Sequence, residues 1–451
     1  MDTPLEPLGL EKALEQRLLD RQARSQLRRL STFPSTTVDF SSNSYLSLST
    51  IPEIRQAFLS RLESHDPALP LFGSGGSRLL DGNSTEAEAL EREIAAFHNA
   101  PAGLLFNSGF DANVGLLSCV IQPGDTVVYD ELIHASAHDG MRMSRAAQRV
   151  PFRHNTVSSA QGGPLGSLAE VLASLTRGDA GRDYRDGTKT IFVAVEAVYS
   201  MDGDVAPLRD IVACISQYLP RGNGRLIVDE AHSTGLFGKD GRGLVCELGL
   251  ERQVFARLHT FGKAMGASGA IVLCSPIVRE YLVNYARTLI YTTAMPPACL
   301  AGIKVAYDSL TTARVEALRT HLRSLTAHAH GLLSSVCEVH RRDEDRGQAT
   351  PLLRIDPAPP RSPILALMSA QPRSLARHCQ ERGFLVRPIV APTVPRGSER
   401  VRICLHAGNT REQVEGLARA VDEWARGEQQ LGAGGEGFRD MQMQAPDKPR
   451  L

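Results

Sequence analysis

The 451-residue sequence lacks several features that mark specialised classes of protein. Basic and acidic residues number 50 each, so no excess of charge indicates a nucleic acid or a membrane surface as a partner. No uninterrupted apolar run approaches the length of a membrane span, and the first thirty residues hold no apolar signal core. Acidic residues in that segment also argue against a transit peptide. We expect an ordinary globular protein.

The eight cysteines show none of the common spacings of functional cysteines. No two of them form a C-x-x-C pair, so we expect neither a metal site nor a thioredoxin-like redox site. Several, such as Cys274, lie in apolar runs, where a buried reduced thiol is the ordinary interpretation. A G-x-G-x-x-G motif after a strand is also missing, which argues against a nicotinamide-dependent oxidoreductase.

Short aliphatic segments alternate with helix-like segments through the middle of the chain. These segments seldom alternate apolar with polar residues, which is typical of a parallel sheet buried on both faces. The lengths between them accommodate crossover helices, so we predict an α/β fold. The predicted strands are AGLLFNSG, DTVVYDE, TIFVAVE, GRLIVDE and SGAIVLC.

Changes of composition divide the chain, which is longer than one hydrophobic core usually serves. A segment rich in Leu, Arg, Gln and Ala, from Gly9 to about Leu30, is predicted to be one helix. Beyond Pro297, a long helical stretch and shorter strands indicate an α+β domain, and the Gly/Gln/Pro-rich end is predicted not to pack. The predicted segments are an N-terminal helix and arm at 1–45, a large cofactor-binding α/β domain at 46–295, a small C-terminal α+β domain at 296–428 and a disordered tail at 429–451.

Polar residues end several of the predicted strands, and open α/β sheets bind ligands at the carboxyl ends of their strands. One strand ends at Asp229, with His232 three residues later. Lys263 lies in the small, apolar segment FGKAMGASGA, where desolvation lowers the pKa of an amine and favours Schiff-base formation. The natural partner is pyridoxal 5'-phosphate, whose protonated ring nitrogen needs an anion such as Asp229.

Each of these residues has a simpler interpretation when taken alone. A strand-end aspartate is more often a cap or turn former, a glycine-flanked lysine is usually solvated, and a lone histidine is a polar filler. The combination of strand–Asp229–x–x–His232 with Thr260–x–x–Lys263 after a later strand favours the cofactor site.

The motifs SMDGD, DEAHSTG and TFGK, in this order and spacing, resemble those of the α-oxoamine synthases. These are pyridoxal-phosphate enzymes of the aspartate-aminotransferase-like fold, fold type I. The likeness extends from QLRRLS to about residue 425 and includes GSGGSRLLDGNS, NSGFDANVG and YTTAMPPA. It implies a large mixed, mostly parallel sheet, a smaller C-terminal α+β domain, and a homodimer with a shared active site.

The resemblance implies roles for the residues around the cofactor ring. Lys263 would form the Schiff base and then remove the α-proton of the amino acid. Asp229 would pair with the ring nitrogen, and His232 would hydrogen-bond the phenolic oxygen. His134, otherwise an ordinary loop histidine, would stack on the ring, and Ser200 would be a further contact near it.

The phosphate group needs hydrogen-bond donors. Ser108, Gly109 and Phe110 follow a predicted strand and open a helix, so their backbone N–H groups and the helix dipole can bind an anion. Thr260 would add a hydroxyl group. By resemblance, Thr293 would contact the phosphate bound to the neighbouring subunit.

The amino-acid substrate needs a group that binds its carboxylate. A planar guanidinium does so with two parallel hydrogen bonds, and the resemblance gives this role to Arg402, assisted by Asn43. Arg400 shares the same strand face, and only the family match separates the two arginines. Ser77 is smaller than the threonine of glycine-using relatives, which favours alanine.

The N-terminal segment carries arginines that would share one face of the predicted helix. A solvated basic face is the ordinary interpretation. The family match of QLRR leads us to the hypothesis that one of them, Arg28, recognises the far carboxylate of the acyl chain or a carrier phosphate. The residues of this face are Arg17, Arg21, Arg24 and Arg28.

The expected reaction joins L-alanine to pimeloyl-CoA, or to pimeloyl-carrier protein, and gives 8-amino-7-oxononanoate, CoA and carbon dioxide in biotin biosynthesis. Other family reactions remain open, with glycine or serine and a different acyl-CoA (5-aminolevulinate, 2-amino-3-ketobutyrate or long-chain sphingoid type). So does a non-catalytic partner subunit, although such subunits typically lack the Schiff-base lysine. Ser47, where the family usually has glycine, loosens the substrate assignment. The last three residues, PRL, resemble a peroxisomal signal, so a cytoplasmic or peroxisomal location is expected.

Overall fold

The computed structural model describes residues 9–24, 26–158, 164–344 and 351–433. The chain divides into two compact units between Val38 and Asp39. The first unit contains helix α1 (Gly9–Ala23), which buries none of its residues. Helices in proteins draw most of their stability from packing an apolar face against other elements. Because α1 buries no side chain, no such packing supports a helix as far as the predicted end near Leu30. Arg28 therefore lies beyond the helix, and the predicted face of four arginines does not form.

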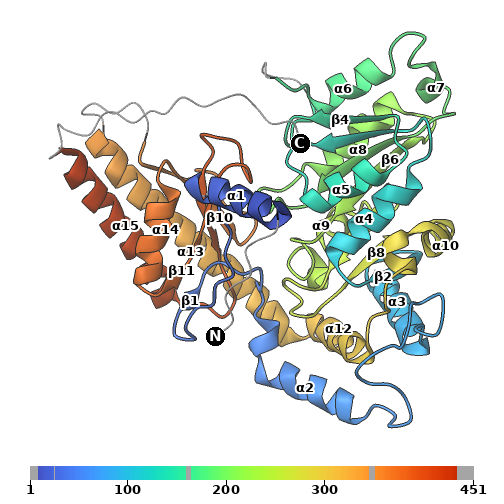
Figure 1. Cartoon of the computed structure of the whole chain (residues 1–451), viewed down its shortest axis with the longest axis horizontal. Helices are drawn as coiled ribbons and strands as arrows, with labels where there is room; N and C mark the ends of the chain where they lie inside the picture. The colour runs from blue at the N-terminus through green and yellow to red at the C-terminus, as the bar shows by residue number, and fades with distance from the viewer. Residues whose placement is uncertain (1–8, 25, 159–163, 345–350, 434–451) are drawn as a thin grey trace. The chain divides into compact units, whose positions relative to one another are not determined.

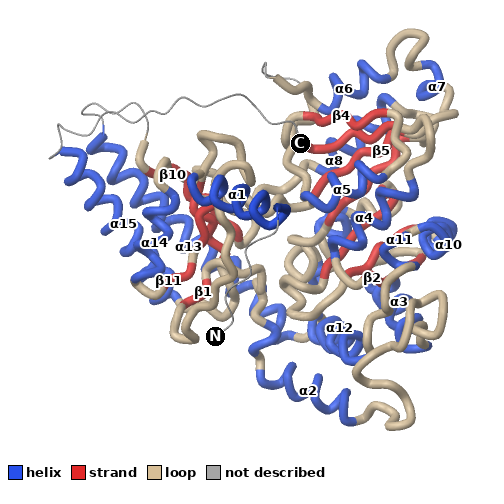
Figure 2. The backbone as a smooth tube through the Cα atoms, viewed as in Figure 1, coloured by secondary structure: helices blue, strands red, loops and turns tan. Residues whose placement is uncertain are grey.

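A seven-stranded sheet is the centre of the second unit (Figures 1 and 2). Its strand order is β2-β8-β7-β6-β5-β3-β4, and every neighbouring pair is parallel except the two made by β8. This confirms the predicted mixed, mostly parallel sheet. The strands are β2 (Ala102–Phe106), β3 (Thr126–Asp130), β4 (Gln148–Phe152), β5 (Ile191–Glu196), β6 (Gly224–Asp229), β7 (Val254–Thr260) and β8 (Ala270–Cys274).

Helices cover both faces of this sheet because its strands are apolar on both sides. Ile227 and Leu258 belong to the buried cluster that packs around helix α4. Helix α8 covers the opposite face. A Cβ atom added to Gly224 would point to that face and lie 2.4 Å from Ile215 of α8. The helices of this region are α2 (Pro52–Glu63), α3 (Thr85–Phe97), α4 (Gly109–Val120), α5 (Ala135–Met143), α6 (Leu168–Leu175), α7 (Arg182–Arg185), α8 (Leu208–Tyr218), α9 (Leu244–Leu248), α10 (Pro276–Tyr285), α11 (Arg287–Ile290) and α12 (Pro297–Leu310).

A smaller antiparallel sheet is built from the C-terminal part of the chain. Its order is β12-β13-β10-β9, and the long helices α13 and α15 pack against each other beside it (Figure 1). The elements are α13 (Ala313–Glu344), β9 (Leu353–Arg354), β10 (Ile364–Ser369), α14 (Pro372–Glu381), β11 (Phe384–Leu385), β12 (Arg387–Ile389), β13 (Arg400–Cys404) and α15 (Arg411–Ala433).

The short strand β1 (Val38–Asp39) spans the division between the two units. Directly after it, the N–H of Phe40 donates to the carbonyl of Leu385 at 2.9 Å. The two sheets lie in the intervals predicted as large and small domains, but residues 39–451 cluster as one compact unit. Helix α15 continues to Ala433, five residues past the predicted boundary at Glu428, because its buried face, including Trp424, packs on α13 and α14. The remainder of the predicted tail lies outside the described residues.

Among the described residues, no helix is both long and apolar enough to cross a membrane. All eight cysteines, each within the described ranges, are free thiols. The part of the chain that the structure describes also holds no group of three or more His, Cys, Asp or Glu side chains that could bind a metal ion.

Candidate active site

The carboxyl ends of β5 and β6 bring two acidic side chains to the same edge of the sheet. Glu196 and Asp229 are register partners at the last position of each strand, and both are buried. The carboxylate of Asp229 accepts hydrogen bonds from Asn113 Nδ2 at 2.7 Å and from the N–H of Ala231 at 2.9 Å. These two donors fix the orientation of a buried anion at a strand end.

Asn113 links Asp229 to His134, and sequence reasoning did not single it out. Its Nδ2 also donates to Ser136 Oγ at 3.0 Å, and that hydroxyl lies 2.8 Å from His134 Nδ1. His134 itself caps the start of α5. The available signal was a single amide within the apolar helical run NVGLL, where a buried polar residue must find a partner.

His232 is buried and meets Tyr45 across a long sequence separation. The hydroxyl of Tyr45 lies 2.7 Å from His232 Nδ1. Burial, together with the nearby charges of Lys263, Arg402 and His134, holds the pKa of His232 well below its usual range. His232 is therefore a neutral hydrogen-bonding group at neutral pH.

Lys263 lies in the turn that follows β7, in the same electrostatic environment. Burial lowers the pKa of its amine, while the charges of Asp229 and Glu196 oppose this shift and Arg402 adds to it. Burial also lowers the pKa of His134, against the charge of Asp229. The structure thus gathers the four predicted catalytic residues, Lys263, Asp229, His232 and His134, around one site.

Glu196 is the second acidic group of this cluster. Burial and the neighbouring charge of Asp229 raise its pKa well above the usual range, although Lys263 and the N–H of His134 counteract the shift. Two buried carboxyl groups with different surroundings favour different protonation states, which is typical of catalytic sites. The carboxylate of Asp229 is held by two donors, the side-chain amide of Asn113 and the N–H of Ala231.

The residues predicted to cradle the phosphate lie at the N-terminus of α4. Ser108 caps the helix, since its Oγ accepts from the N–H of Asp111 at 3.0 Å and donates to that residue's carboxylate at 2.8 Å. A Cβ at Gly109 would lie 3.2 Å from Thr260, so glycine keeps this space open. The hydroxyl of Thr260 is 3.3 Å from the carbonyl of Gly269. The first N–H groups of a helix, here those of Gly109 and the exposed Phe110, have no partner within the helix and can bind an anion.

Thr293 and Ser77 lie in neighbouring loops. The carbonyl of Thr293 accepts from Asn107 Nδ2 at 2.9 Å, next to the start of the cradle, and Thr293 is exposed. The loop of Ser77 is attached beside it, since the N–H of Ala294 donates to the carbonyl of Gly76 at 2.8 Å. The predicted contacts of Thr293 and Ser77 with phosphate and substrate remain predictions.

The two arginines of β13 have different partners, which sequence periodicity could not show. Arg400, which is buried, forms an ion pair with the partly exposed Asp202. Arg402 instead donates to the carbonyls of Ser200, at 3.2 Å, and Ser41, at 3.0 Å, and to Asn43 Oδ1, at 3.2 Å. Its Nε is buried without a partner in the described structure. A guanidinium near Lys263 that is held by neutral groups and keeps an unused donor suits a carboxylate ligand.

Glu230, which follows Asp229 directly, has a structural role. Its carboxylate accepts the N–H groups of Leu244 at 2.7 Å and Val245 at 2.9 Å, which caps α9, and it also accepts from the hydroxyl of Ser233. The LIVDEAHSTG segment thus divides its acidic residues between the site and the loop that supports it.

Arg28 is exposed and belongs to the first unit of the chain. Its proposed recognition of the acyl group stays a prediction. The terminal PRL segment, predicted to be a peroxisomal signal, lies outside the described residues.

Comparison with known proteins places this site in a family. The model of the aminotransferase class I and II family matches residues 35–421. An 8-amino-7-oxononanoate synthase of Emericella nidulans is 50% identical over 418 residues, which cover 93% of this chain and 96% of the relative. The aminoacyl transferase sphA of Aspergillus fumigatus is 37% identical over 445 residues, covering 96% and 90%. The chain belongs to the α-oxoamine synthases.

The solved structures agree with this assignment. A serine palmitoyltransferase variant from S. paucimobilis, with a bound PLP–myriocin aldimine, matches with a TM-score of 0.75 and 25% identity, over 93% of this chain and 99% of that chain. The fold is therefore fold type I, as predicted, and the protein is a pyridoxal-phosphate-dependent acyltransferase.

The residues present fit this cofactor. The glycine-lined start of α4 offers N–H groups for a phosphate, Asp229 offers an oriented carboxylate, and Lys263 offers an amine whose pKa is lowered by burial. The unused Nε of Arg402 provides a donor for a substrate anion in the same site.

Proposed function

We propose that this enzyme condenses L-alanine with pimeloyl-CoA, or with a pimeloyl-carrier protein, to give 8-amino-7-oxononanoate in biotin biosynthesis. The observation that carries the proposal is the joint placement of Lys263, Asp229, His232 and Arg402 around one site. The half-identical synthase of Emericella nidulans supports this choice among the reactions of the family.

The chain's own residues account for the proposed steps. Arg402, held by Ser200, Ser41 and Asn43, binds the carboxylate of the amino acid. Lys263, whose amine is favoured in its neutral form by burial, takes the α-proton and later returns one. Pyridoxal phosphate, when bound, supplies the electron sink that makes the α-carbon acidic.

The remaining residues would hold the cofactor. Asp229 would keep the ring nitrogen protonated, neutral His232 would donate or accept at the phenolic oxygen, and His134 would cover the ring. The start of α4 with Thr260 would bind the phosphate. The overall reaction would join the α-carbon of alanine to the thioester carbonyl and release the thiol and carbon dioxide, and Lys263 would return the proton that the α-carbon needs after decarboxylation.

The main alternative is a reaction of the same family with an acyl donor other than pimeloyl-CoA. The relative named aminoacyl transferase sphA, 37% identical, covers nearly the whole chain, so an acyl chain other than pimeloyl has support. Ser77 favours alanine over glycine as the amino acid in either case. A pocket selective for a chain that ends in carboxylate should reject a palmitoyl chain.

Mass spectrometry of the products distinguishes these alternatives. The holoenzyme is incubated with alanine, glycine or serine crossed against a panel of acyl-CoAs, with Lys263→Ala as the inactive control. The proposal expects the alanine–pimeloyl product to dominate. Dominant turnover of a long-chain or succinyl donor would replace it.

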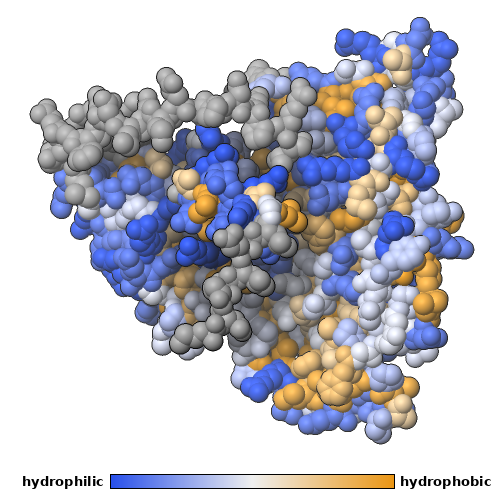
Figure 3. Space-filling model, in the orientation of Figure 1, coloured by the Kyte–Doolittle hydropathy of each residue, from blue (hydrophilic) through white to orange (hydrophobic). Residues whose placement is uncertain are grey.

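We also propose a homodimer with a shared site. Large apolar side chains are exposed at the start of α4 and in the loop of Thr293, since Phe110 is 47% and Tyr291 72% exposed. Figure 3 shows further hydrophobic surface at the lower end of that view, where α2 and α12 lie. The molar mass from light scattering should equal two chains, and a monomer with full activity would contradict this.

A cytoplasmic or peroxisomal location is proposed as well. Fusing the last dozen residues to a fluorescent reporter separates the two, because a peroxisomal signal should give punctate fluorescence and its absence a diffuse one.

A further inference from the structure

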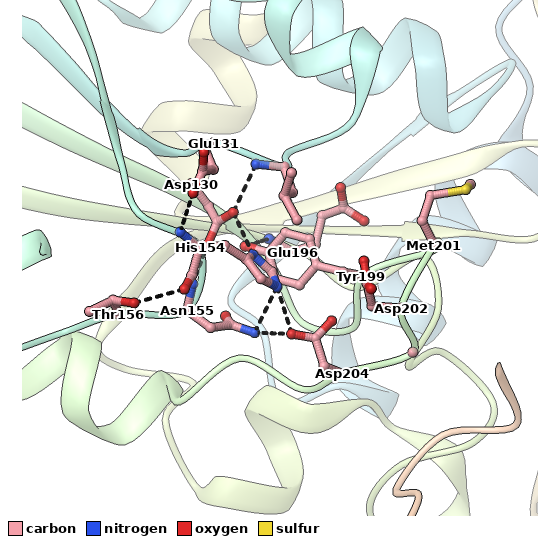
Figure 4. A network of polar contacts seen from close by, with 12 residues as sticks. Asp130, Glu131, His154, Asn155, Thr156, Glu196, Tyr199, Met201, Asp202 and Asp204 are labelled. Atoms are coloured by element: carbon pink, nitrogen blue, oxygen red, sulfur yellow. Dashed lines mark hydrogen bonds and ion pairs between the residues drawn. The ribbon is translucent and has the colours of Figure 1, made fainter. Parts of the chain in front are cut away.

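A polar network lies beside the active site, at the carboxyl ends of β3 and β4 (Figure 4). His154, two residues after β4, lies between two carboxylates. Its Nδ1 is 2.8 Å from Asp130 Oδ1, and its Nε2 is 2.6 Å from Asp204 Oδ2. The edge of its ring contacts Tyr199, with the centroids 4.4 Å apart. His154 therefore joins the end of β3 to the segment that contains Asp204.

The geometry determines the charge of His154. Both ring nitrogens face carboxylate oxygens, which only accept hydrogen bonds when ionised, so both nitrogens must carry a proton. Asp130 is already directed by the N–H groups of Leu132, at 3.0 Å, and Asn155, at 2.9 Å. These donors use the Asp130 carboxylate as an acceptor, as His154 does, and the ring between the two acids is an imidazolium.

The segment 199–204 contains the SMDGD motif and is attached on its other side to β13. Asp202 pairs with Arg400, and the carbonyl of Ser200 accepts from Arg402 Nη1 at 3.2 Å. The hydroxyl of Ser362 donates to the carbonyl of Gly203 at 2.6 Å. One short loop thus has His154 on one side and the proposed carboxylate-binding arginine on the other.

We propose that His154 is a positioning residue, a cation that anchors the 199–204 loop to the end of β3 so that the loop holds Arg402 ready for the substrate carboxylate. The inference rests on the role proposed for Arg402. His154 itself touches neither substrate nor cofactor. Its effect passes through Asp204 and the carbonyl of Ser200.

The charge state of the anchor is stable at neutral pH. Burial alone would lower the pKa of His154, but the hydrogen bonds and charges of Asp130 and Asp204 outweigh it and raise the pKa to about 10. The other ionisable groups facing the ring do not compete for this proton. Glu131 accepts from the N–H of His154, and burial raises the pKa of Tyr199 well above its usual range, so Tyr199 stays neutral.

The test compares two ligands of the holoenzyme that differ only in the carboxylate, alanine and ethylamine. Binding is measured from the absorbance change of the bound cofactor. Two variants break the anchor. Asp204→Asn keeps the side-chain shape and leaves Asp130 paired, and His154→Gln removes the cation. In both variants alanine should bind about tenfold more weakly, as expected for one lost charge-assisted hydrogen bond. Ethylamine binding should stay within about twofold, since it makes no carboxylate contact.

The control is Asp179→Asn, which removes an exposed acid whose partner is Arg182. It should leave both affinities within about twofold. If His154→Gln does not fold because the buried Asp130 loses its partner, Asp204→Asn alone decides the outcome.

Arg402→Gln separates the two ways of failing. If this variant weakens alanine selectively but Asp204→Asn weakens both ligands equally, or neither, the anchor is overturned and the role of Arg402 stands. If Arg402→Gln is not selective for alanine either, the carboxylate-binding role fails and the anchor fails with it.

Discussion

Charged side chains have different surroundings at the carboxyl end of the seven-stranded sheet and on strand β13 of the four-stranded sheet. At the sheet end, burial and close neighbours shift the pKa values of Lys263 and Glu196 in opposite directions. On β13, carbonyl groups and one acid hold the guanidinium groups of Arg400 and Arg402 in place. Groups whose pKa is shifted suit proton transfer, and fixed arginines suit recognition. The comparison predicts that mutations in the first region reduce kcat and those in the second raise KM.

The largest expected effect is that of Lys263→Ala. Removing the amine should lower kcat by about four orders of magnitude or more, because both covalent attachment and proton transfer are lost. Initial rates of CoA release measure this, with Lys189→Ala, a partly exposed lysine paired with Asp183, as the control. A loss below about tenfold would remove Lys263 from the chemistry.

The second prediction concerns the two arginines of β13. Arg402→Gln should raise the KM for alanine by about 10- to 100-fold, the contribution of one or two charge-assisted hydrogen bonds, with a smaller change in kcat. Arg400→Gln should have a smaller effect, because Arg400 acts through Asp202. The ratio of the two KM values is the measurement. If Arg400→Gln raised it more, the roles would be exchanged.

The third prediction separates Glu230 from its neighbour Asp229. Glu230→Gln places an amide group against N–H donors, so the free energy of unfolding should fall by about 1–3 kcal/mol. At a permissive temperature, kcat should change little. Urea denaturation measures the first quantity, and a large loss of kcat in a fully folded variant would give Glu230 a catalytic role.

The last prediction concerns stability alone, as a pH dependence that arises from His154. Its pKa is raised from about 6.5 in the unfolded chain to about 10 in the folded protein. The stabilisation is therefore complete below about pH 6.5 and is lost as pH rises through about 10. Between these pH values the free energy of unfolding should decrease with pH in the wild type. The slope for the wild type should exceed the slope for His154→Gln by about 1.4 kcal/mol per pH unit. Parallel slopes in urea titrations would contradict the raised pKa.

The strands of the large sheet could be predicted because their sequence is locally unambiguous. Buried parallel strands need aliphatic residues on both faces, and the runs that end at Glu196 and Asp229 satisfy this. The edge strand β4, with sequence QRVPF, carries no such run because half of it is exposed. The end of α1 was predicted wrongly for the opposite reason, since helix-forming residues continue where no packing supports a helix.

Some residues of the site can be proposed from local sequence motifs, whereas others depend on partners that are distant in the sequence. Asp229 ends a strand, His232 and Lys263 come shortly after strands, and all three belong to recognisable motifs, so they could be proposed from the sequence alone. Asn113 and His154 act through partners far away in the chain, and only the folded structure shows those partners. The different partners of Arg400 and Arg402 also needed the folded structure, because both side chains lie on one strand face and only the family match separated them in the sequence.

The most direct test of the central claim is exchange of the α-proton of alanine in heavy water, followed by proton NMR with the holoenzyme and no acyl donor. Asp229→Asn should retain cofactor, yet its exchange rate at saturating alanine should fall by about 10²- to 10⁴-fold, because the ring nitrogen loses its counter-ion. Arg402→Gln should recover most of the exchange rate once alanine is saturating. Near-normal exchange in Asp229→Asn at saturation would contradict the account.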